Sequence, residues 1–486
     1  MPIDIKKIDP KDWVFKSMRQ RVSPFPNYMS MESICNDMAK SSVALNADEI
    51  ILFYVNNVHH CFLYKKSWQE VGRGMADKIY KDSGLVSKLI KEQNHFGKRF
   101  VKFTSKAHSM ALDKLSNEEL FGLYAGFEER YKQVYSRYGW IWIAEDFIQE
   151  DLLKLINDKV KDFNQSAMIV DILTKEPGAM VAQEERRALL EMALKAKKSG
   201  VKNKWIEKHV ADYYWVTRDY EDPILDFASV SKRLKDYLST DFEKELSDLL
   251  ESLKKDEIKR RKYLKELKFS RAEKNYFTSM RQVNYLKELR KRYVSEGLYH
   301  FDKVLIEIGR RLFLGLKQVR FMATSDVKRA LLNGEDLTEE LNARYRLSLW
   351  HSVEGGQTDI ITGKEAEDAF AIMCKVDKNA TEFTGMPVSP GVARGPVRII
   401  INPDECDKVQ KGDVIVSIQV VPSFSTAIMK AAALVCDGGH GITTHPATLA
   451  REAGIPGVIQ TRFAREALKD GDMVEVDGNR GVVIKL

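Results

Sequence analysis

The stretch from residue 433 to residue 453 constrains the fold of this chain more than any other. Residues 433–436 (ALVC) are apolar and predict a short buried strand. Residues 438–441 (GGHG) follow at once, and glycine allows the backbone to turn tightly and to approach a ligand closely. Residues 446–453 then have a helical pattern. The stretch therefore predicts a strand, a glycine turn and a short helix.

The start of that helix is a predicted anion site. Thr443 and Thr444 are helix-capping residue types, and Pro446 suits the first helical turn. His445 is therefore expected at or beside the N-cap, where free N–H groups and the helix dipole favour a negative charge. A free imidazole has a pKa of about 6.5, so much of it is neutral and nucleophilic at pH 7. Local physics thus indicates a histidine that can accept and hold a phosphoryl group.

Length and composition predict a soluble protein of two or three domains. The chain has 486 residues, which exceeds one ordinary domain. Its 44% hydrophobic content is enough for real cores, and no uncharged apolar run reaches the ~18 residues of a membrane span. The opening residues 1–13 lack the apolar stretch of a secretory signal. We therefore expect a cytoplasmic protein without a membrane partner.

Cysteines and histidines give no sign of a metal site. The five cysteines are scattered and have no CxxC spacing, which indicates a reducing compartment and neither a disulfide framework nor a zinc site. His59 and His60 are adjacent on a predicted strand, so they point to opposite faces and cannot share a metal. We expect a structural or exposed role for both, and no metal ligands are predicted.

The net charge of +7 lies before residue 385, because 11 basic and 11 acidic residues balance from Gly385 onward. Such an excess can attract nucleotides, phosphorylated compounds or an acidic partner surface. Solvated faces of Lys-rich helices are the more common explanation. No zinc-finger, RNA-recognition or homeodomain pattern is present, so no nucleic-acid partner is predicted.

The larger, N-terminal part of the chain is predicted to be mainly helical. Residues before 49 suggest an irregular lead-in, and residues 49–55 (EIILFYV) suggest a strand. Residues 116–119 (SNEE) form a capping box that opens a helix. A leucine stripe over 246–267 and a helix over 297–316 predict further core helices of an irregular bundle.

Composition changes near residue 350, and a compact α/β module follows. The predicted domains are a mainly helical region over 1–374, a polar linker over 375–384 and the α/β module over 385–486. Helices are expected at 424–432 and 446–453. The expected strands are 397–401, 413–418, 434–436, 457–460, 473–476 and 482–485.

Four segments of this module, in the right order, carry a resemblance. They are 385–397 (GMPVSPGVARGPV), 421–433, 443–456 and 476–478 (VDG). Together they resemble the phosphohistidine swivelling domain of phosphoenolpyruvate-utilising enzymes. The resemblance implies a C-terminal α/β phosphohistidine swivelling domain that moves between two sites.

A second resemblance concerns the helical region. Residues 306–312 (IEIGRRL), 327–331 and 359–363 are similar to the acceptor-binding region of rifampin phosphotransferase. The sequence shows neither a pyruvate-binding barrel nor the glycine-rich loop of an ATP-grasp domain. The two-part architecture is similar to that of phenylphosphate synthase, whose ATP-binding part is a separate subunit. The resemblance thus implies that ATP and Mg²⁺ act through an ATP-grasp partner chain.

The resemblance also implies roles for residues. His445 is the expected phosphocarrier, and Gly441, Thr443, Thr444 and Arg451 are expected to support its phosphate. Two readings stay open for the threonines, which also suit plain helix capping. Arg451 is equally suited to a surface ion pair.

Two further positions are less constrained. Arg281 falls where the similar helical region has an arginine near the transferred phosphate, although helix-face arginines are usually solvated or paired. His440 stands where the family usually has glycine, either as a second proton donor or as a tolerated side chain.

The sequence therefore predicts a phosphotransferase component that carries a phosphoryl group on His445 from an ATP-grasp partner to a small-molecule acceptor on the helical domain. The alternative is a non-catalytic phosphocarrier or regulatory docking subunit of a phosphoenolpyruvate synthase-like complex. A swivelling-fold scaffold without chemistry is the third reading, and the intact threonine–histidine motif disfavours it.

Overall fold

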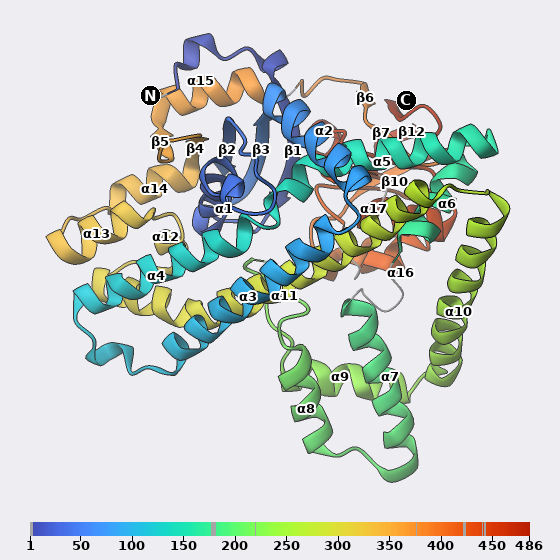
Figure 1. Ribbon diagram of the computed structural model, residues 1–486, viewed down its shortest axis with the longest axis horizontal. Helices are drawn as coiled ribbons and strands as arrows, with labels where there is room; N and C mark the ends of the chain where they lie inside the picture. The colour runs from blue at the N-terminus through green and yellow to red at the C-terminus, as the bar shows by residue number, and fades with distance from the viewer. Residues whose placement is uncertain are drawn as a thin grey trace.

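The computed structural model describes residues 3–175, 181–218, 220–375, 377–420, 424–439, 441 and 444–486. A large, mainly helical part precedes residue 375, and a strand-rich α/β domain follows it (Figure 1). The predicted fold class is therefore confirmed. In the described ranges, no helix is both long enough and apolar enough to cross a membrane.

The helical part is built around an antiparallel sheet of five strands in the order β1-β3-β2-β4-β5. The predicted strand at 49–55 is β2, but the lead-in predicted before it contains a strand, β1. The strands are β1 (Trp13–Gln20), β2 (Glu49–Val55), β3 (Val58–Tyr64), β4 (Leu347–Val353) and β5 (Asp359–Thr362). Because β2 pairs with β4, nearly the whole helical region is an insertion between two neighbouring strands.

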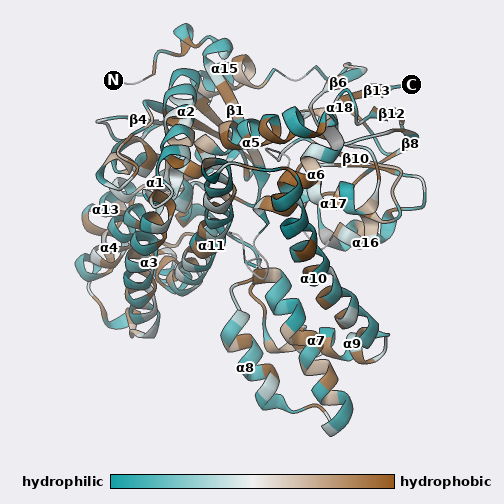
Figure 2. Ribbon diagram, turned by 45° about the vertical axis from the view of Figure 1, so that its right-hand side comes forward, coloured by the Kyte–Doolittle hydropathy of each residue, from teal (hydrophilic) through white to brown (hydrophobic). Residues whose placement is uncertain are grey.

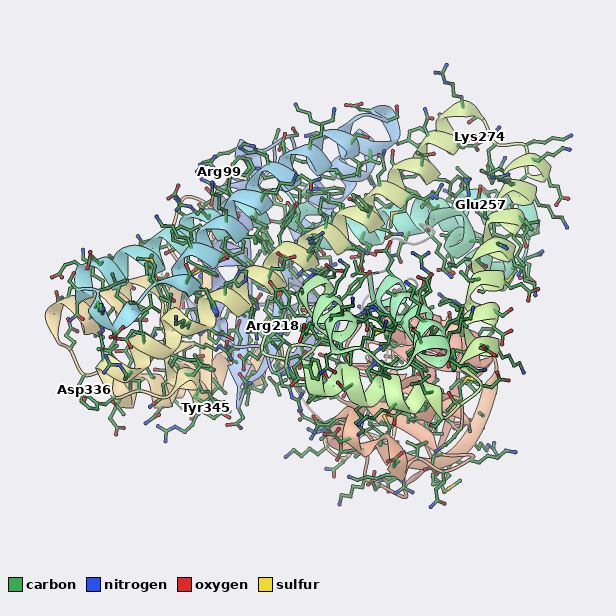
Figure 3. The ribbon with its side chains drawn as sticks, turned by 90° about the horizontal axis from the view of Figure 1, so that it is seen from below. Arg99, Arg218, Glu257, Lys274, Asp336 and Tyr345 are labelled. Atoms are coloured by element: carbon green, nitrogen blue, oxygen red, sulfur yellow. The ribbon has the colours of Figure 1, made fainter. Side chains whose placement is uncertain are left out.

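Fifteen helices of this part are described, and the long helices α3 and α11 run side by side (Figure 1). Figure 3 shows Lys274, near the start of α11, and Asp336, beyond its end, on opposite sides of the molecule. The helices are α1 (Pro24–Asn36), α2 (Lys65–Lys81), α3 (Leu85–Ser109), α4 (Asn117–Tyr135), α5 (Gly139–Val160), α6 (Phe163–Thr174), α7 (Val181–Ser199), α8 (Asn203–Tyr213), α9 (Phe227–Leu238), α10 (Phe242–Glu266), α11 (Arg271–Leu312), α12 (Leu316–Val319), α13 (Thr324–Asn333), α14 (Thr338–Arg346) and α15 (Gly363–Met373).

Helices α7 to α10 form a lobe with its own apolar core, which projects from the rest of the molecule (Figures 1 and 2). Along these helices teal and brown residues alternate in Figure 2, as expected where one face is buried. The predicted leucine stripe lies on α10, but only part of it is core. Leu246 is buried, whereas Leu250 is 38% exposed because α10 packs chiefly near its two ends.

Two local predictions in the helical part are confirmed. Ser116 Oγ accepts from the Glu119 N–H at 3.1 Å, and Glu119 Oε2 accepts from the Ser116 N–H at 2.8 Å, which is the predicted capping box at the start of α4. Most of the helix predicted over 297–316 is the last part of α11, which ends at Leu312. It begins far earlier, after Ser270, whose hydroxyl caps it through a second such box.

The C-terminal domain is an eight-stranded sheet in the order β6-β13-β12-β8-β9-β10-β11-β7. Strands β8 to β11 are parallel and form its centre. The strands are β6 (Glu382–Thr384), β7 (Met386–Ser389), β8 (Val392–Ile399), β9 (Val414–Ser417), β10 (Ala433–Cys436), β11 (Gly457–Ile459), β12 (Met473–Asp477) and β13 (Val482–Lys485). The helices are α16 (Ser425–Ile428), α17 (His445–Ala453) and α18 (Ala464–Ala467).

All six predicted strands of this domain are present within a few residues, whereas β6, β7 and α18 were not predicted. Strand β6 lies inside the segment that the sequence assigns to the linker, 375–384, and pairs with β13. The helix predicted over 424–432 is only one turn long. It ends early because the Lys430 carbonyl accepts from the Gly412 N–H, which draws the chain back to the strand that follows.

The two parts of the molecule are in contact along β1, the edge strand of the five-stranded sheet. Ile418 and Phe463 of the C-terminal domain pack into the apolar cluster that contains Phe15 and Met18. On the same side, Arg21 Nη2 donates to Asn402 Oδ1 at 2.6 Å. The C-terminal domain is therefore docked on the N-terminal part in this structure.

Candidate functional site

His445 is the first residue of α17 and lies beyond the carboxyl end of β10. Thr444 is the N-cap, with extended backbone angles, and Pro446 lies in the first turn. The His445 side chain is exposed. The sequence thus predicted the position of this histidine correctly. A site outside the carboxyl ends of parallel strands is where α/β sheets commonly bind ligands.

Thr444 ties the start of α17 back to the glycine loop. Its hydroxyl donates to the Gly441 carbonyl at 2.9 Å, so the side chain is directed toward the loop instead of the helix end. The backbone carbonyl of Thr444 accepts from the Thr448 N–H at 2.9 Å and begins the helical pattern. The predicted phosphate ligand Thr443 and the neighbouring His440 lie outside the described residues.

Asp437 anchors the other end of the loop, directly after β10. Its buried carboxylate accepts from Thr461 Oγ1 at 2.6 Å, from the Ala464 N–H at 2.8 Å and from the Arg465 N–H at 3.0 Å. Burial raises the pKa of Asp437 to about 6. Sequence reasoning missed this residue, although an acidic residue that ends an apolar strand was an available signal.

Two glycines of the loop lie against the N-terminal part of the chain. A Cβ atom at Gly438 would lie 2.8 Å from the Met18 carbonyl oxygen on β1. A Cβ atom at Gly441 would lie 2.6 Å from Gln149 Oε1 on α5, and Gly441 also has a φ of +90°. The close approach predicted for these glycines is therefore made, in this arrangement, to the chain's own N-terminal part.

A polar network faces the loop from α5 and α11. Gln149 Nε2 donates to Glu145 Oε1 at 2.9 Å, and Lys287 Nζ forms a short ion pair with the same oxygen. Gln149 is buried, and Glu145 and Lys287 are mostly shielded from solvent. Nothing in the sequence pattern marks these three residues, because they come together only in the tertiary structure.

A second ionic cluster involves Asp146, the residue that follows Glu145 on α5. The ammonium group of Lys16 on β1 is fully buried and lies 2.6 Å from Asp146 Oδ2. Trp68 on α2 donates to the same oxygen at 2.8 Å. A buried pair of this kind is stable only with additional hydrogen bonds, which Trp68 supplies here. The interactions of Asp146 with Lys16 and Trp68 thus connect β1, α2 and α5.

The far end of α17 faces α6. Arg451 Nη1 donates to the Val388 carbonyl at 3.1 Å. Burial lowers the pKa of Arg451, and the negative charges of Asp171 and Glu452 act in the opposite direction. Burial also raises the pKa of Glu452, which Lys175 opposes. Six residues separate Arg451 from His445, or about 9 Å along the helix axis. A phosphate-binding role for Arg451 stays a prediction.

Arg281 is half-buried on α11, the helix that also carries Lys287. Its assignment to an acceptor site stays a prediction.

His59 and His60 are both buried and face opposite sides of the sheet, toward Tyr54 and Phe370 respectively. Across the described ranges, no group of three or more His, Cys, Asp or Glu side chains is arranged to hold a metal ion.

An α/β domain with a histidine at the start of the helix that follows a central parallel strand is the arrangement expected of a phosphohistidine domain. Residues 409–481 match the family model described as the mobile domain of PEP-utilising enzymes. The C-terminal domain of this chain therefore belongs to that family.

Curated relatives agree with this assignment. A probable phosphoenolpyruvate synthase of Archaeoglobus fulgidus is 33% identical over 171 residues, which are 34% of this chain and 22% of the relative. The uncharacterized phosphotransferase YvkC of Bacillus subtilis is 35% identical over 171 residues, 34% of this chain and 20% of the relative. A probable phosphoenolpyruvate synthase of Methanothermobacter thermautotrophicus is 33% identical over 225 residues, 45% of this chain and 29% of the relative. The chain thus spans less than a third of each of these proteins.

Among solved structures, Thermococcus kodakaraensis aconitase X overlaps 22% of this chain and 99% of its own with 19% identity and a TM-score of 0.18. Similarity at that level carries no functional argument.

Proposed function

We propose that this chain is a phosphotransferase component in which His445 carries a phosphoryl group to an acceptor held by the helical part. The observation that carries the proposal is the exposed His445 at the start of α17, in a domain of the PEP-utilising mobile-domain family. In the first step, a neutral imidazole nitrogen attacks the donor phosphorus, a P–N bond forms and the donor's P–O bond breaks. In the second step, an acceptor oxygen attacks the same phosphorus and the P–N bond breaks. One difficult transfer is thus divided into two.

The donor in this proposal is ATP with Mg²⁺, held by a separate ATP-grasp partner. The support is that the relatives include probable phosphoenolpyruvate synthases. Gly441, Thr443, Thr444 and Arg451 are the proposed supports of the phosphate on His445. The hydrogen bond from Thr444 to Gly441 favours this role, since it fixes the loop beside the imidazole.

The acceptor in this proposal is a small molecule bound where the mobile domain meets α5, α6 and α11. The docked position of the domain supports this choice, because Gly441 is packed against Gln149 there. Lys287 and the predicted Arg281 provide basic groups on α11, which suit a transferred phosphate.

The test is phosphorylation of the purified chain. We expect acid-labile, base-stable label on the wild type after incubation with ³²P-labelled phosphoramidate, or with ATP labelled at its β and γ phosphates, Mg²⁺ and a candidate ATP-grasp partner. His445→Ala is expected to take up no label, whereas His95→Ala, at an exposed histidine on α3, keeps full labelling. Acid-labile label that persists in His445→Ala overturns the proposal. A labelled chain that passes its phosphoryl group to no small molecule supports the alternative of a regulatory carrier.

A further inference from the structure

The loop between Asp437 and Thr444, named here the carrier loop, contacts α5 through Gly441. A Cβ atom at Gly441 would lie 2.6 Å from Gln149 Oε1 and 3.0 Å from its Nε2. Its φ of +90° independently disfavours any residue with a side chain. The loop backbone and the Gln149 amide are therefore in direct contact, and a shift of either one must move the other.

Glu145 decides which end of the Gln149 amide faces the carrier loop. Gln149 Nε2 donates to Glu145 Oε1 at 2.9 Å, one turn earlier on α5. An ionised carboxylate can only accept, so the amide nitrogen must face Glu145 and the amide oxygen must face the loop. Lys287 holds the same Glu145 oxygen from α11. Two side chains, Glu145 of α5 and Lys287 of α11, thus fix the orientation of the Gln149 amide.

The position of Gly441 also determines the position of His445. The Gly441 carbonyl accepts from the Thr444 hydroxyl at 2.9 Å, and Thr444 is the N-cap of the helix that begins with His445. A group that fixes Gly441 therefore also fixes the start of α17. Transfer between bound groups requires positions within fractions of an ångström, and small misplacements are costly.

We infer that Gln149 is a positioning residue. It holds the carrier loop in a defined position on the helical part while the phosphoryl group passes from His445 to the acceptor, and Glu145 and Lys287 orient its amide. The inference rests on the proposed function and deepens it. Gln149 is 5% exposed in the docked arrangement, so the contact is made away from water. Phosphorylation of His445 by a small reagent such as phosphoramidate requires only the imidazole and does not require Gln149.

The experiment compares hydrogen–deuterium exchange in the full chain and its variants. In Gln149→Ala, backbone exchange over 436–450 is expected to rise about five- to tenfold, because the loop loses its buried contact with the Gln149 amide. Gln149→Met retains the size of the side chain without its amide and is expected to show a similar rise. Glu145→Gln, which permits either amide orientation, is expected to show a smaller one. Charging by phosphoramidate stays within about twofold of the wild type in Gln149→Ala, since it does not use the docked state.

Gln282→Ala is the matched control. Gln282 lies on α11, is half-buried and donates to Ser87 Oγ on α3 at 2.8 Å. Its loss is expected to leave exchange over 436–450 unchanged.

Three outcomes overturn the inference. They are unchanged loop exchange in Gln149→Ala, wild-type behaviour of Gln149→Met, and a rise spread evenly over the chain with a lower melting temperature. The third would mark Gln149 as a purely structural residue. Failure of the proposed function is separate, because it appears as a wild-type chain that phosphoramidate does not charge, whatever the exchange data show.

Discussion

His445 is held in place by residues on both sides of its loop. Asp437 fixes the point where the chain leaves β10, through three hydrogen bonds to the segment before and within α18. Thr444 closes the other end onto Gly441. The exposed His445 thus follows a loop that is anchored at both ends, which favours a defined position of its imidazole.

The first prediction concerns the titration of His60, which is buried. Burial lowers the pKa of His60 to about 4, against about 6.5 in the unfolded chain. The unfolded state therefore binds protons between these values that the folded state does not. The free energy of unfolding is expected to decrease by about 3 kcal/mol as the pH falls from about 6.5 to about 4.

The measurement is chemical denaturation of the wild type and His60→Phe between pH 7 and pH 4. The variant places a second ring beside Phe370 and should lose this part of the pH dependence. Asp437, whose pKa is raised, contributes with the opposite sign in both proteins, so the difference between them isolates His60. Identical pH profiles would contradict the prediction.

Helices α3 and α11 approach each other through a reciprocal pair of glycines. A Cβ atom at Gly97 of α3 would lie 2.1 Å from the Tyr293 ring, and one at Gly297 of α11 would lie 2.1 Å from the Phe100 ring. Each helix thus supplies a glycine where the other supplies an aromatic ring. Glycine lowers helix stability by about 1 kcal/mol, and the close packing of the rings offsets this loss.

We predict that Gly97→Ala destabilises the protein although alanine favours helices. Overpacking against Tyr293 is expected to cost about 1–3 kcal/mol, which exceeds the gain in propensity of about 1 kcal/mol. Gly122→Ala on α4 is the control, because a Cβ atom there meets nothing within 4 Å. It should raise the melting temperature while Gly97→Ala lowers it. Equal shifts of both variants would show that the contact between α3 and α11 can relax.

The whole molecule holds its mobile domain docked through an apolar contact and a polar one. Ile418 and Phe463 pack toward Phe15 on β1, and the carrier loop lies on α5. If the domain carries a phosphoryl group between two sites, as we propose, it must leave this position. We therefore expect the docked state to be only moderately stable.

We predict that Phe463→Ala shifts the molecule toward the undocked state. The loss of a partly buried phenyl ring is worth about 1–2 kcal/mol, or roughly a tenfold change in population. Small-angle X-ray scattering should report a larger radius of gyration, and proteolysis within 375–384 should be faster. Phe313→Ala, at a side chain that is 96% exposed on the end of α11, should change neither. An unchanged radius in Phe463→Ala would mean that polar contacts alone hold the domain.

Predictability from the sequence differed between the two sheets. The strands of the mobile domain are short apolar runs bounded by glycine, so local pattern was sufficient for six of them. Strands β1, β4 and β5 of the other sheet were missed. Strand β1 contains the buried Lys16, whose charge is acceptable only because Asp146 and Trp68 meet it. Strand β4 is paired with β2 across about 290 residues of sequence, and no local pattern reports such a pairing.

The sequence by itself determined the glycine turn, the helix that begins at His445 and the family of the C-terminal domain. These features depend on capping, turn geometry and hydrophobic runs, which act over a few neighbouring residues. Only the tertiary structure decided what the carrier loop faces. Gln149, Glu145 and Lys287 are brought to it by tertiary packing, although they lie about 290 residues (α5) and about 150 residues (α11) before it in the chain. Contacts of that kind arise from shape and charge complementarity between folded surfaces.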